Sequence, residues 1–354
     1  MNKYKRKPRV LHLFNAFRIG GVEQQHLAIV RELRDTFEQT CWAINHGPME
    51  DGLDEMGIPH CSGHFRIIPK MIELNEYDCI VMRTNRPLFV IADYLRDCPI
   101  PLVYIRSYLR WSEEHTTFFD PEWDPIGINV ADYTLFSGPS LRNPTIELMG
   151  DIPGGEILYN GLDLKKYSMA SRPAPATDKP LKVGMLSTIK PLKNQLKAIE
   201  VMREGLEMGS FELFIGGIAY DEEEYGNKVK EAAKNLPVHL LGYVDNPPEF
   251  LKGIDVLLMT STLEGWPIAI MEALASGLPV VTADVGDVTE LMGKARPGYI
   301  YPSGEYDRIP GLLAAMRDPE TYETFSRLAV ERAPLFDIQR TAQHVADAVF
   351  SVLK

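Results

Sequence analysis

The stretch EGWPIAIMEALASG, residues 264–277, contains the start, the end and one charged position of a short helix. Pro267 suits the first helical residue, which needs no N–H, and Gly277 suits a left-handed residue just past the helix end. Between them every side chain is apolar or small except that of Glu272. Because an ionised carboxylate on a buried helix is costly without a partner, we expect Glu272 to bind another group.

The start of this helix is also a place where an anion would bind. The first amides of a helix lack intrahelical acceptors, and the helix dipole is positive at that end. Glu264 lies just before the helix, so a second carboxylate stands beside these amides. Phosphate oxygens are typical ligands of such a helix start. The stretch therefore predicts an anion site flanked by two carboxylate acceptors.

Length and composition indicate an ordinary soluble protein of two domains. The chain has 354 residues, of which 45% are hydrophobic and 24% charged, and no apolar run approaches the roughly 20 residues that span a bilayer. The four cysteines are scattered without a C-x-x-C spacing: Cys41, Cys61, Cys79 and Cys98. This spacing favours reduced thiols over a disulfide framework or a zinc site, and we expect a cytoplasmic location.

Charge argues against nucleic acid as a main partner. The net charge is −12, whereas a nucleic-acid binder needs a concentrated positive field. The first nine residues are basic and lack the hydrophobic core of a signal peptide,. A solvated tail is the simpler interpretation, and weak contact with the inner face of a membrane through anionic lipid is the alternative.

Apolar runs of strand length alternate with helical or irregular segments in the first half of the chain. The runs lie at 9–14, 39–44, 79–82, 101–106, 133–137 and 156–159. This alternation predicts a mainly parallel sheet covered by helices. Gly20 and Gly21 lie between the first run and a helical pattern at 22–33, where their backbone would allow a ligand to approach closely,.

A proline-rich segment, residues 171–180, interrupts all periodicity and is the predicted linker,. Strand-like runs then resume at 181–186, 211–216, 238–241, 255–259 and 279–283, with helical patterns at 192–208, 222–235, 267–276 and 288–292. We expect an N-terminal domain at 1–170, a second domain at 181–335, and a last helix within 336–354 that packs back on the first domain. The loop 260–265 would lie at the carboxyl ends of the strands, where such sheets bind ligands.

Several motifs along the chain together resemble one enzyme family. They are Gly20-Gly21-Val22-Glu23, Tyr159-Asn160-Gly161-Leu162-Asp163, Lys193-Asn194, Gly242-Tyr243-Val244, and the pattern E-G-x-P-x-x-x-x-E-A-x-A-x-G-x-P-V-V from Glu264, followed by Gly286 and Glu290. The chain resembles the retaining, nucleotide-sugar-dependent glycosyltransferases of family 4 with the GT-B fold. The resemblance implies an α/β protein with two facing Rossmann-like domains, parallel sheets and a cleft between them.

The resemblance also implies a role for each donor-side residue. Glu264 would accept hydrogen bonds from sugar hydroxyls, and Glu272 would bind both ribose hydroxyls, as suits a carboxylate with two oxygens,. The backbone segment Gly265, Trp266, Pro267 and Ile268, in which all residues but the proline have an N–H, would meet the diphosphate together with Gly20 and Gly21,. Trp266 takes a position where relatives usually have an aromatic residue, with simple packing as the alternative. Gly242, Tyr243 and Val244 would lie near the base.

Two departures from the family pattern concern cations. Relatives usually have an Arg soon after the glycine of the strand at 181–186, but residues 185–188 here are Met-Leu-Ser-Thr. Lys193, expected to be catalytic, and Lys190 would then hold the diphosphate, although a lysine cannot reproduce a bidentate guanidinium. Many relatives also have a His near the end of the strand at 101–106, where this chain offers only Arg106 and Ser107. Arg106 would contact a phosphate or an anionic acceptor, or would pair with a nearby acid.

The expected function is transfer of a hexose-like sugar to an acceptor hydroxyl on a glycan, a lipid-linked sugar or a small molecule. The resemblance implies no metal and no cofactor beyond the nucleoside-diphosphate sugar, with Glu264, Lys193 and Arg106 as the catalytic set. No histidine pair has a metal-ligand spacing, and the acidic run at 221–224 suits a helix start,. The alternatives are a sugar-nucleotide epimerase or hydrolase on the same fold, and a carbohydrate-binding scaffold with little activity.

Overall fold

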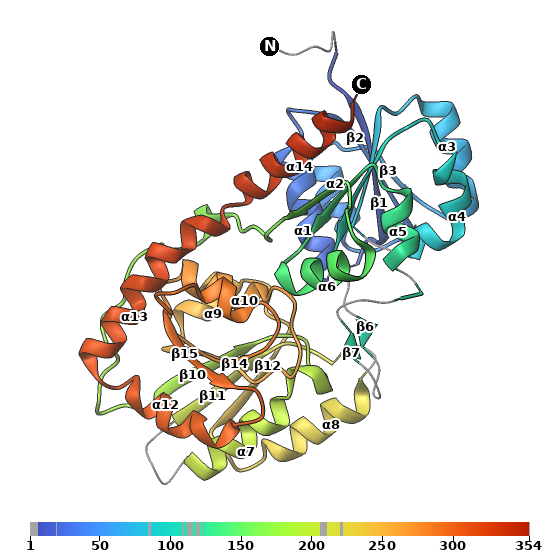
Figure 1. Ribbon diagram of the computed structural model, residues 1–354. Helices are drawn as coiled ribbons and strands as arrows, with labels where there is room; N and C mark the ends of the chain where they lie inside the picture. Colours follow the sequence, from blue (N-terminus) through green and yellow to red (C-terminus); the bar gives the residue numbers. More distant parts are fainter. Residues whose placement is uncertain are drawn as a thin grey trace. The chain divides into compact units, whose positions relative to one another are not determined.

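The computed structural model describes residues 6–18, 20–83, 86–107, 110–111, 116–117, 121–122, 124–205, 211–219 and 222–353. The chain forms two compact units: unit 1 comprises residues 1–161 and 338–354, and unit 2 comprises residues 162–337 (Figure 1). Residues 1–5 of the predicted basic tail and residue 221 of the acidic run lie outside the described residues. The loops from Arg83 to Trp123, in which the sequence predicts the acceptor specificity, are described only in part.

Unit 1 is built on a parallel sheet with the strand order β3-β2-β1-β4-β5-β8-β9. Its strands are β1 Arg9–Ala16, β2 Glu38–Asn45, β3 His60–Ser62, β4 Cys79–Met82, β5 Leu102–Arg106, β8 Tyr133–Phe136 and β9 Gly154–Ile157. A separate antiparallel pair consists of β6 Arg110–Trp111 and β7 Thr116–Thr117. The helices are α1 Gly21–Glu32, α2 Met49–Glu55, α3 Ile68–Asn75, α4 Arg86–Arg96, α5 Asp124–Val130, α6 Pro139–Met149 and α14 Ile338–Val352.

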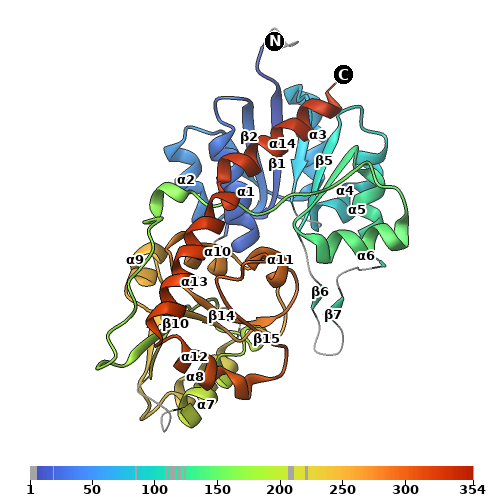
Figure 2. The same ribbon diagram turned by 60° about the vertical axis from the view of Figure 1, so that its left-hand side comes forward.

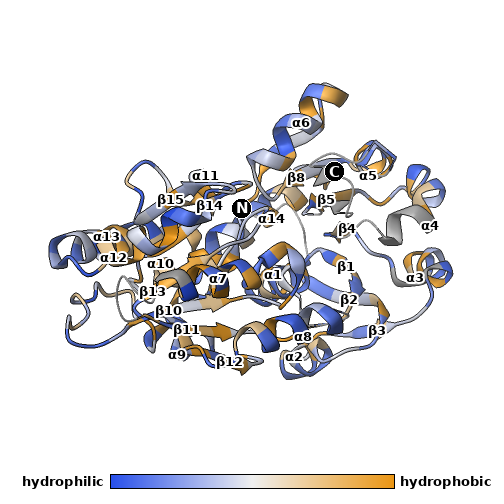
Figure 3. Ribbon diagram, turned by 90° about the horizontal axis from the view of Figure 1, so that it is seen from below, coloured by the Kyte–Doolittle hydropathy of each residue, from blue (hydrophilic) through white to orange (hydrophobic). Residues whose placement is uncertain are grey.

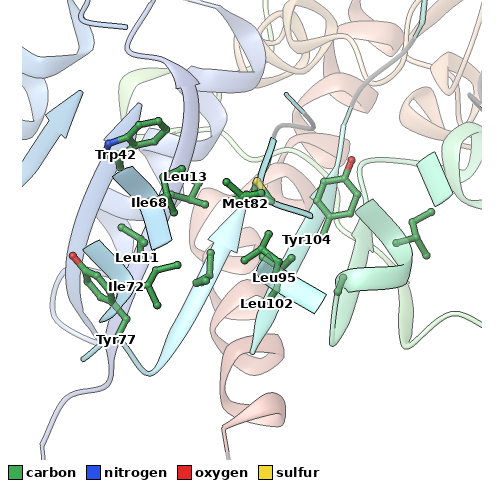
Figure 4. Packing of buried hydrophobic residues seen from close by; sticks show 14 of the residues in the cluster. Leu11, Leu13, Trp42, Ile68, Ile72, Tyr77, Met82, Leu95, Leu102 and Tyr104 are labelled. Atoms are coloured by element: carbon green, nitrogen blue, oxygen red, sulfur yellow. The ribbon is translucent and has the colours of Figure 1, made fainter. Parts of the chain in front are cut away.

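Alternation along β1 places side chains on the two faces of this sheet. Leu11 and Leu13 point into a core that includes Ile72 of α3 and Leu95 of α4 (Figure 4). Val10 points to the opposite face, where α1 and α14 cover the strands. Helix α14 runs beside α1 in both ribbon views (Figures 1 and 2). Both faces of the sheet are therefore buried, which explains the nearly continuous apolar strands.

Unit 2 has a second parallel sheet with the order β12-β11-β10-β13-β14-β15. Its strands are β10 Leu181–Leu186, β11 Phe211–Gly216, β12 Val238–Gly242, β13 Val256–Met259, β14 Val280–Asp284 and β15 Gly298–Pro302. The helices are α7 Gln195–Gly205, α8 Glu223–Ala232, α9 Pro247–Lys252, α10 Ile268–Ala275, α11 Val288–Met292, α12 Ile309–Ala315 and α13 Pro319–Arg332. The apolar β10 and β11 contrast with the largely hydrophilic α8 (Figure 3).

Most predicted strands are present within a residue or two of their expected bounds, and the short edge strands β3 and β15 were not predicted. The helix predicted at 192–208 begins later, at Gln195, because a 3-10 turn at Pro191–Lys193 and the left-handed Asn194, with φ of 53°, come first. Its predicted end, residue 208, lies outside the described residues. None of the helices in the described ranges has the length and apolarity needed to cross a membrane.

Candidate functional site

Helix α10 and the residues before it form the centre of the candidate site in unit 2. The prediction for Pro267 was wrong by one residue: its ψ of 114° is extended, so the helix begins at Ile268 and Pro267 precedes it. The prediction for Gly277 is confirmed, because it has φ of 62° just after the helix. A Cβ atom at Gly277 would lie 2.1 Å from the carbonyl oxygen of Ala170, so a larger residue would not fit.

Glu264 and Lys193 are brought together by the loops that follow the neighbouring strands β13 and β10. Lys193 Nζ lies 2.5 Å from Glu264 Oε1, and both side chains are largely buried. The hydroxyl of Thr260 donates to the carbonyls of Lys193, at 3.1 Å, and Asn194, at 3.0 Å. The amide of Thr262 donates to Leu192 at 2.9 Å. These bonds hold the turn that carries Lys193 against the loop that carries Glu264.

Gly286 allows the loop after β14 to pack against the backbone of Glu264. Its φ of 55° is left-handed, and a Cβ atom there would lie 1.9 Å from the carbonyl oxygen of Glu264. The next residue, Asp287, donates its amide to the carbonyl of Gly265 at 3.1 Å. Only a glycine allows this close approach of the loop after β14. The glycine of the sequence pattern therefore positions the segment that leads into α10.

Glu272 has a partner, as we expected, and that partner is Tyr167. The hydroxyl of Tyr167 donates to Glu272 Oε1 at 3.0 Å. Burial raises the pKa of Glu272 to about 7, although the hydrogen bond from Tyr167 opposes the shift. Tyr167 lies 105 positions away in the sequence, and no spacing rule links the two. A carboxyl with one neutral partner keeps acceptor capacity for further hydroxyl groups.

Lys190 lies near Lys193 and Glu264. Burial lowers the pKa of Lys190, the charge of Lys193 lowers it further, and Glu264 raises it. Met185, which follows the glycine of β10, is 2% exposed and packs in the core. The two lysines are thus the cations that the described part of this loop offers in place of the arginine of similar enzymes.

The segment Gly242-Tyr243-Val244 follows the edge strand β12 at the same end of the sheet. Backbone hydrogen bonds join the loop after β10 to the loop after β11: the amide of Ser187 donates to the carbonyl of Gly216 at 3.0 Å, and that of Ile189 to Ile218 at 2.9 Å. The amide of Gly217 in turn donates to the carbonyl of Gly242 at 2.7 Å. Tyr243 is exposed. The segment therefore shares the carboxyl edge with Lys190.

The side chain of Trp266 packs in the interior of unit 2. It is 6% exposed, donates its indole N–H to the sulfur of Met271 at 3.0 Å, and lies edge-to-face on Phe336 with ring centroids 6.4 Å apart. Packing was one of the two interpretations of this residue from the sequence. Any contact of Trp266 with a ligand would therefore come from its backbone amide.

The remaining predicted site residues belong to unit 1. Gly20 precedes α1 in an extended conformation, with φ of −151°, and Gly21 is the first helical residue. Arg106 ends β5 and pairs with Asp124, with 2.8 Å between Arg106 Nε and Asp124 Oδ1, and both side chains are 1% exposed. Of the two interpretations of Arg106, the structure shows the one in which it pairs with a nearby acid. Asp124 was not predicted as its partner.

A second arginine of unit 1, Arg83, was missed. It comes directly after the wholly apolar strand β4 and is 3% exposed. The position itself was the available signal, because polar residues at the carboxyl end of a parallel strand are candidates for ligand binding. Within the described residues, no group of three or more His, Cys, Asp or Glu side chains is placed to hold a metal ion.

Comparison with known proteins supports the predicted class of enzyme. Residues 170–332, just under half of the chain, match the family described as Glycosyl transferases group 1. The poly(glycerol-phosphate) alpha-glucosyltransferase of Bacillus subtilis (strain 168) is 26% identical over 153 residues, which cover 43% of this chain and 22% of the relative. The chain spans about a fifth to about half of the length of the first curated relatives that it matches.

Two comparisons cover nearly the whole chain. The capsular polysaccharide biosynthesis glycosyltransferase CapH of Staphylococcus aureus is 22% identical over 370 residues, covering 97% of this chain and 99% of the relative. The structure of Anabaena HepE in complex with UDP-glucose has a TM-score of 0.80 at 21% identity, covering 97% of this chain and 100% of that one. The predicted fold class, α/β with the GT-B fold, is confirmed. The matches together support a GT-B glycosyltransferase.

Proposed function

We propose that the protein is a retaining hexosyltransferase that moves a sugar from a nucleoside diphosphate to an acceptor hydroxyl, without a metal ion. The observation that carries this proposal is the arrangement in unit 2. There the pair Lys193–Glu264 and the start of α10 follow the carboxyl ends of β10 and β13 at one edge of the parallel sheet, and Glu272 lies within α10. This is the edge at which open α/β sheets bind nucleotides.

The diphosphate of the donor would lie on the amides at the start of α10. These amides, with Lys190 and Lys193, would stabilise the negative charge that grows on the leaving nucleotide. Glu264 would accept hydrogen bonds from the sugar hydroxyls, and its 2.5 Å contact with Lys193 orients the carboxylate. Glu272, positioned by Tyr167, would accept hydrogen bonds from the hydroxyls of the ribose,.

The reaction needs no base from the protein. The bond between the anomeric carbon and the phosphate oxygen breaks, and a bond to the acceptor oxygen forms on the same face of the sugar. The acceptor proton passes to the departing phosphate oxygen, so that charge and atoms balance. Catalysis would then come from positioning and from the fixed charges around the diphosphate.

The relatives support a carbohydrate acceptor and a uridine nucleotide. CapH is named for capsular polysaccharide biosynthesis, and the structures of HepE hold UDP, with glucose or as UDP-glucose. We propose UDP-hexose as the donor and a glycan or lipid-linked saccharide as the acceptor. A cytoplasmic location, with weak contact to the inner face of a membrane, belongs to the same proposal.

A donor panel tests this function. The full chain is incubated with UDP-, GDP- and ADP-sugars and a set of saccharide acceptors, with and without EDTA, and release of the nucleoside diphosphate is measured. We expect release with one class of donor, undiminished by EDTA, and a product with the anomeric configuration of the donor. Release without any acceptor and without glycoside product would favour the hydrolase or epimerase, and binding of a donor without release would favour the scaffold.

A further inference from the structure

Arg83 is a buried cation whose described partners are all neutral. It follows β4, and its Nε donates to Ser107 Oγ at 2.9 Å. Its Nη2 donates to Ser137 Oγ at 3.4 Å and to the side-chain oxygen of Asn160. The third nitrogen, Nη1, is buried and has no hydrogen-bond partner among the described residues. A guanidinium has five N–H groups, so part of its donor capacity is unused.

Among the described residues, the acid near Arg83 is engaged with another arginine. Glu23 is the acid whose charge acts on Arg83, but its carboxylate pairs with Arg18, with 3.3 Å between Arg18 Nε and Glu23 Oε1. Burial lowers the pKa of Arg83 to about 10, which leaves it protonated at neutral pH. A buried charge without a counter-ion is expensive for the fold. A bound anion would remove this cost.

The groups that surround Arg83 lie at the ligand-binding edge of the unit 1 sheet. Strands β4, β5, β8 and β9 are successive neighbours in that sheet. Arg83 and Ser107 come directly after β4 and β5, Ser137 comes directly after β8, and Asn160 comes three residues after β9. Two serine hydroxyls and a guanidinium are donors that suit the oxygens of a phosphate or a carboxylate. The described side chains thus form a polar set around one unpaired cation.

We propose that Arg83, with Ser107 and Ser137, binds an anionic group of the acceptor, a phosphate or a carboxylate. This inference rests on the proposed function, because it assigns the site to the acceptor of that transfer. The charges of the donor diphosphate already have partners in unit 2, namely Lys190, Lys193 and the start of α10. The acceptor is therefore a negatively charged saccharide or a phosphate-linked one.

Binding of inorganic phosphate in the presence of saturating UDP tests the site without any turnover. UDP occupies the phosphate positions of unit 2, so that added phosphate reports on another site. We expect phosphate to raise the Tm of the full chain saturably at constant ionic strength, because a ligand that binds only the folded state stabilises it. Acetate is the second probe, and a larger effect of phosphate than of acetate would assign the acceptor group as a phosphate.

Three variants separate this site from others. Arg83→Gln should weaken phosphate binding at least tenfold and leave the affinity for UDP unchanged. Arg83→Lys keeps the positive charge but not the planar guanidinium with its paired N–H donors, so it should retain part of the affinity for phosphate. Arg34→Gln removes one exposed charge from the same unit and should have no effect. An unchanged phosphate affinity in Arg83→Gln would overturn the proposal, and a loss of UDP affinity instead would assign Arg83 to the donor.

A structural measurement covers the case in which Arg83→Gln does not fold. Crystals of the unaltered chain with UDP are soaked in selenate, whose anomalous signal locates it. We expect selenate within hydrogen-bond distance of Arg83 Nη1, and selenate bound elsewhere only would overturn the proposal. If donor turnover is never found but phosphate binds at Arg83, the proposed function fails and the anion site stands.

Discussion

Two buried arginines follow neighbouring strands of the unit 1 sheet and have opposite surroundings. Arg106, at the end of β5, pairs with the carboxylate of Asp124. Arg83, after β4, has two serine hydroxyls and an amide oxygen instead. The paired arginine stabilises the fold by itself, whereas the unpaired one needs a ligand to complete its surroundings. Unit 2 shows the same contrast between the pair Lys193–Glu264 and Glu272, whose partner Tyr167 is neutral.

The largest expected effect concerns the paired arginine. Asp124→Asn removes the carboxylate that pairs with Arg106 at a buried position, which should reduce the free energy of unfolding by about 3–5 kcal/mol,. Arg83→Met removes a charge that has no acid partner among the described residues and should not reduce this free energy. Urea unfolding of the full chains, followed by circular dichroism, measures both. Equal losses of stability in the two variants would remove the contrast between the arginines.

The next effect concerns Glu272, the carboxyl whose described partner, Tyr167, is neutral. Its pKa is about 7 in the folded protein without ligand, against 4.5 as the ordinary value. The folded state therefore favours the neutral form, so that the contribution of Glu272 to stability is fully present below pH 4.5 and is lost as the pH rises through about 7,. The loss should be about 3 kcal/mol. Glu272→Gln should abolish this part of the pH dependence in urea unfolding, whereas Glu323→Gln, at an exposed position, should keep it.

Replacement of Glu264, the carboxylate that pairs with Lys193, should lower turnover rather than stability. Glu264→Gln keeps a hydrogen-bond acceptor for Lys193 but loses the charge, and we expect at least a tenfold lower kcat, about 1.4 kcal/mol. The measurement is the initial rate of nucleoside diphosphate release with the donor that the panel identifies. Glu323→Gln again serves as the control. Full activity in a folded Glu264→Gln protein would exclude a role of this carboxylate at the sugar.

The smallest expected effect concerns Lys190, the lysine near the Lys193–Glu264 pair. Lys190→Met should weaken UDP binding roughly two- to fivefold, about 0.5–1 kcal/mol, because it removes one partly exposed charge near the diphosphate. Lys252→Met, at an exposed helix end, is the matched control. Calorimetric titration with UDP compares the two. Equal affinity in both variants would show that Lys190 does not replace the arginine of similar enzymes.

Local signals in the sequence predict much of unit 2. Gly277 ends its helix as expected, and an acid on an apolar helix indicates that a partner exists. The identity of that partner depends on tertiary structure, so Tyr167 could not be inferred. Pro267 shows the limit of a local rule, since proline is compatible both with the first helical residue and with the extended residue before it.

Unit 1 was less predictable because its two buried arginines, Arg83 and Arg106, belong to no motif. Arg106 has a partner, Asp124, on a helix 18 residues away, and Arg83 interacts with residues that follow three other strands. Continuous apolar runs locate the central strands such as β4 and β5, because these are buried on both faces,. The strands β3 and β15 were missed since both lie at sheet edges and are short or partly exposed, where the apolar signal is weak.

Helix α14 has a consequence for the synthesis of the chain. Its side chains Ala342, Val345 and Val349 complete a core with Val10 and Val81, although all of unit 2 lies between them in the sequence. A ribosome that adds about 5–20 residues per second takes roughly 10–35 seconds to make unit 2. During that interval the part of the unit 1 sheet that α14 covers remains exposed, while unit 2 is continuous and can fold first. The protein is thus completed by its last helix, and the first strands made are among the last to be buried.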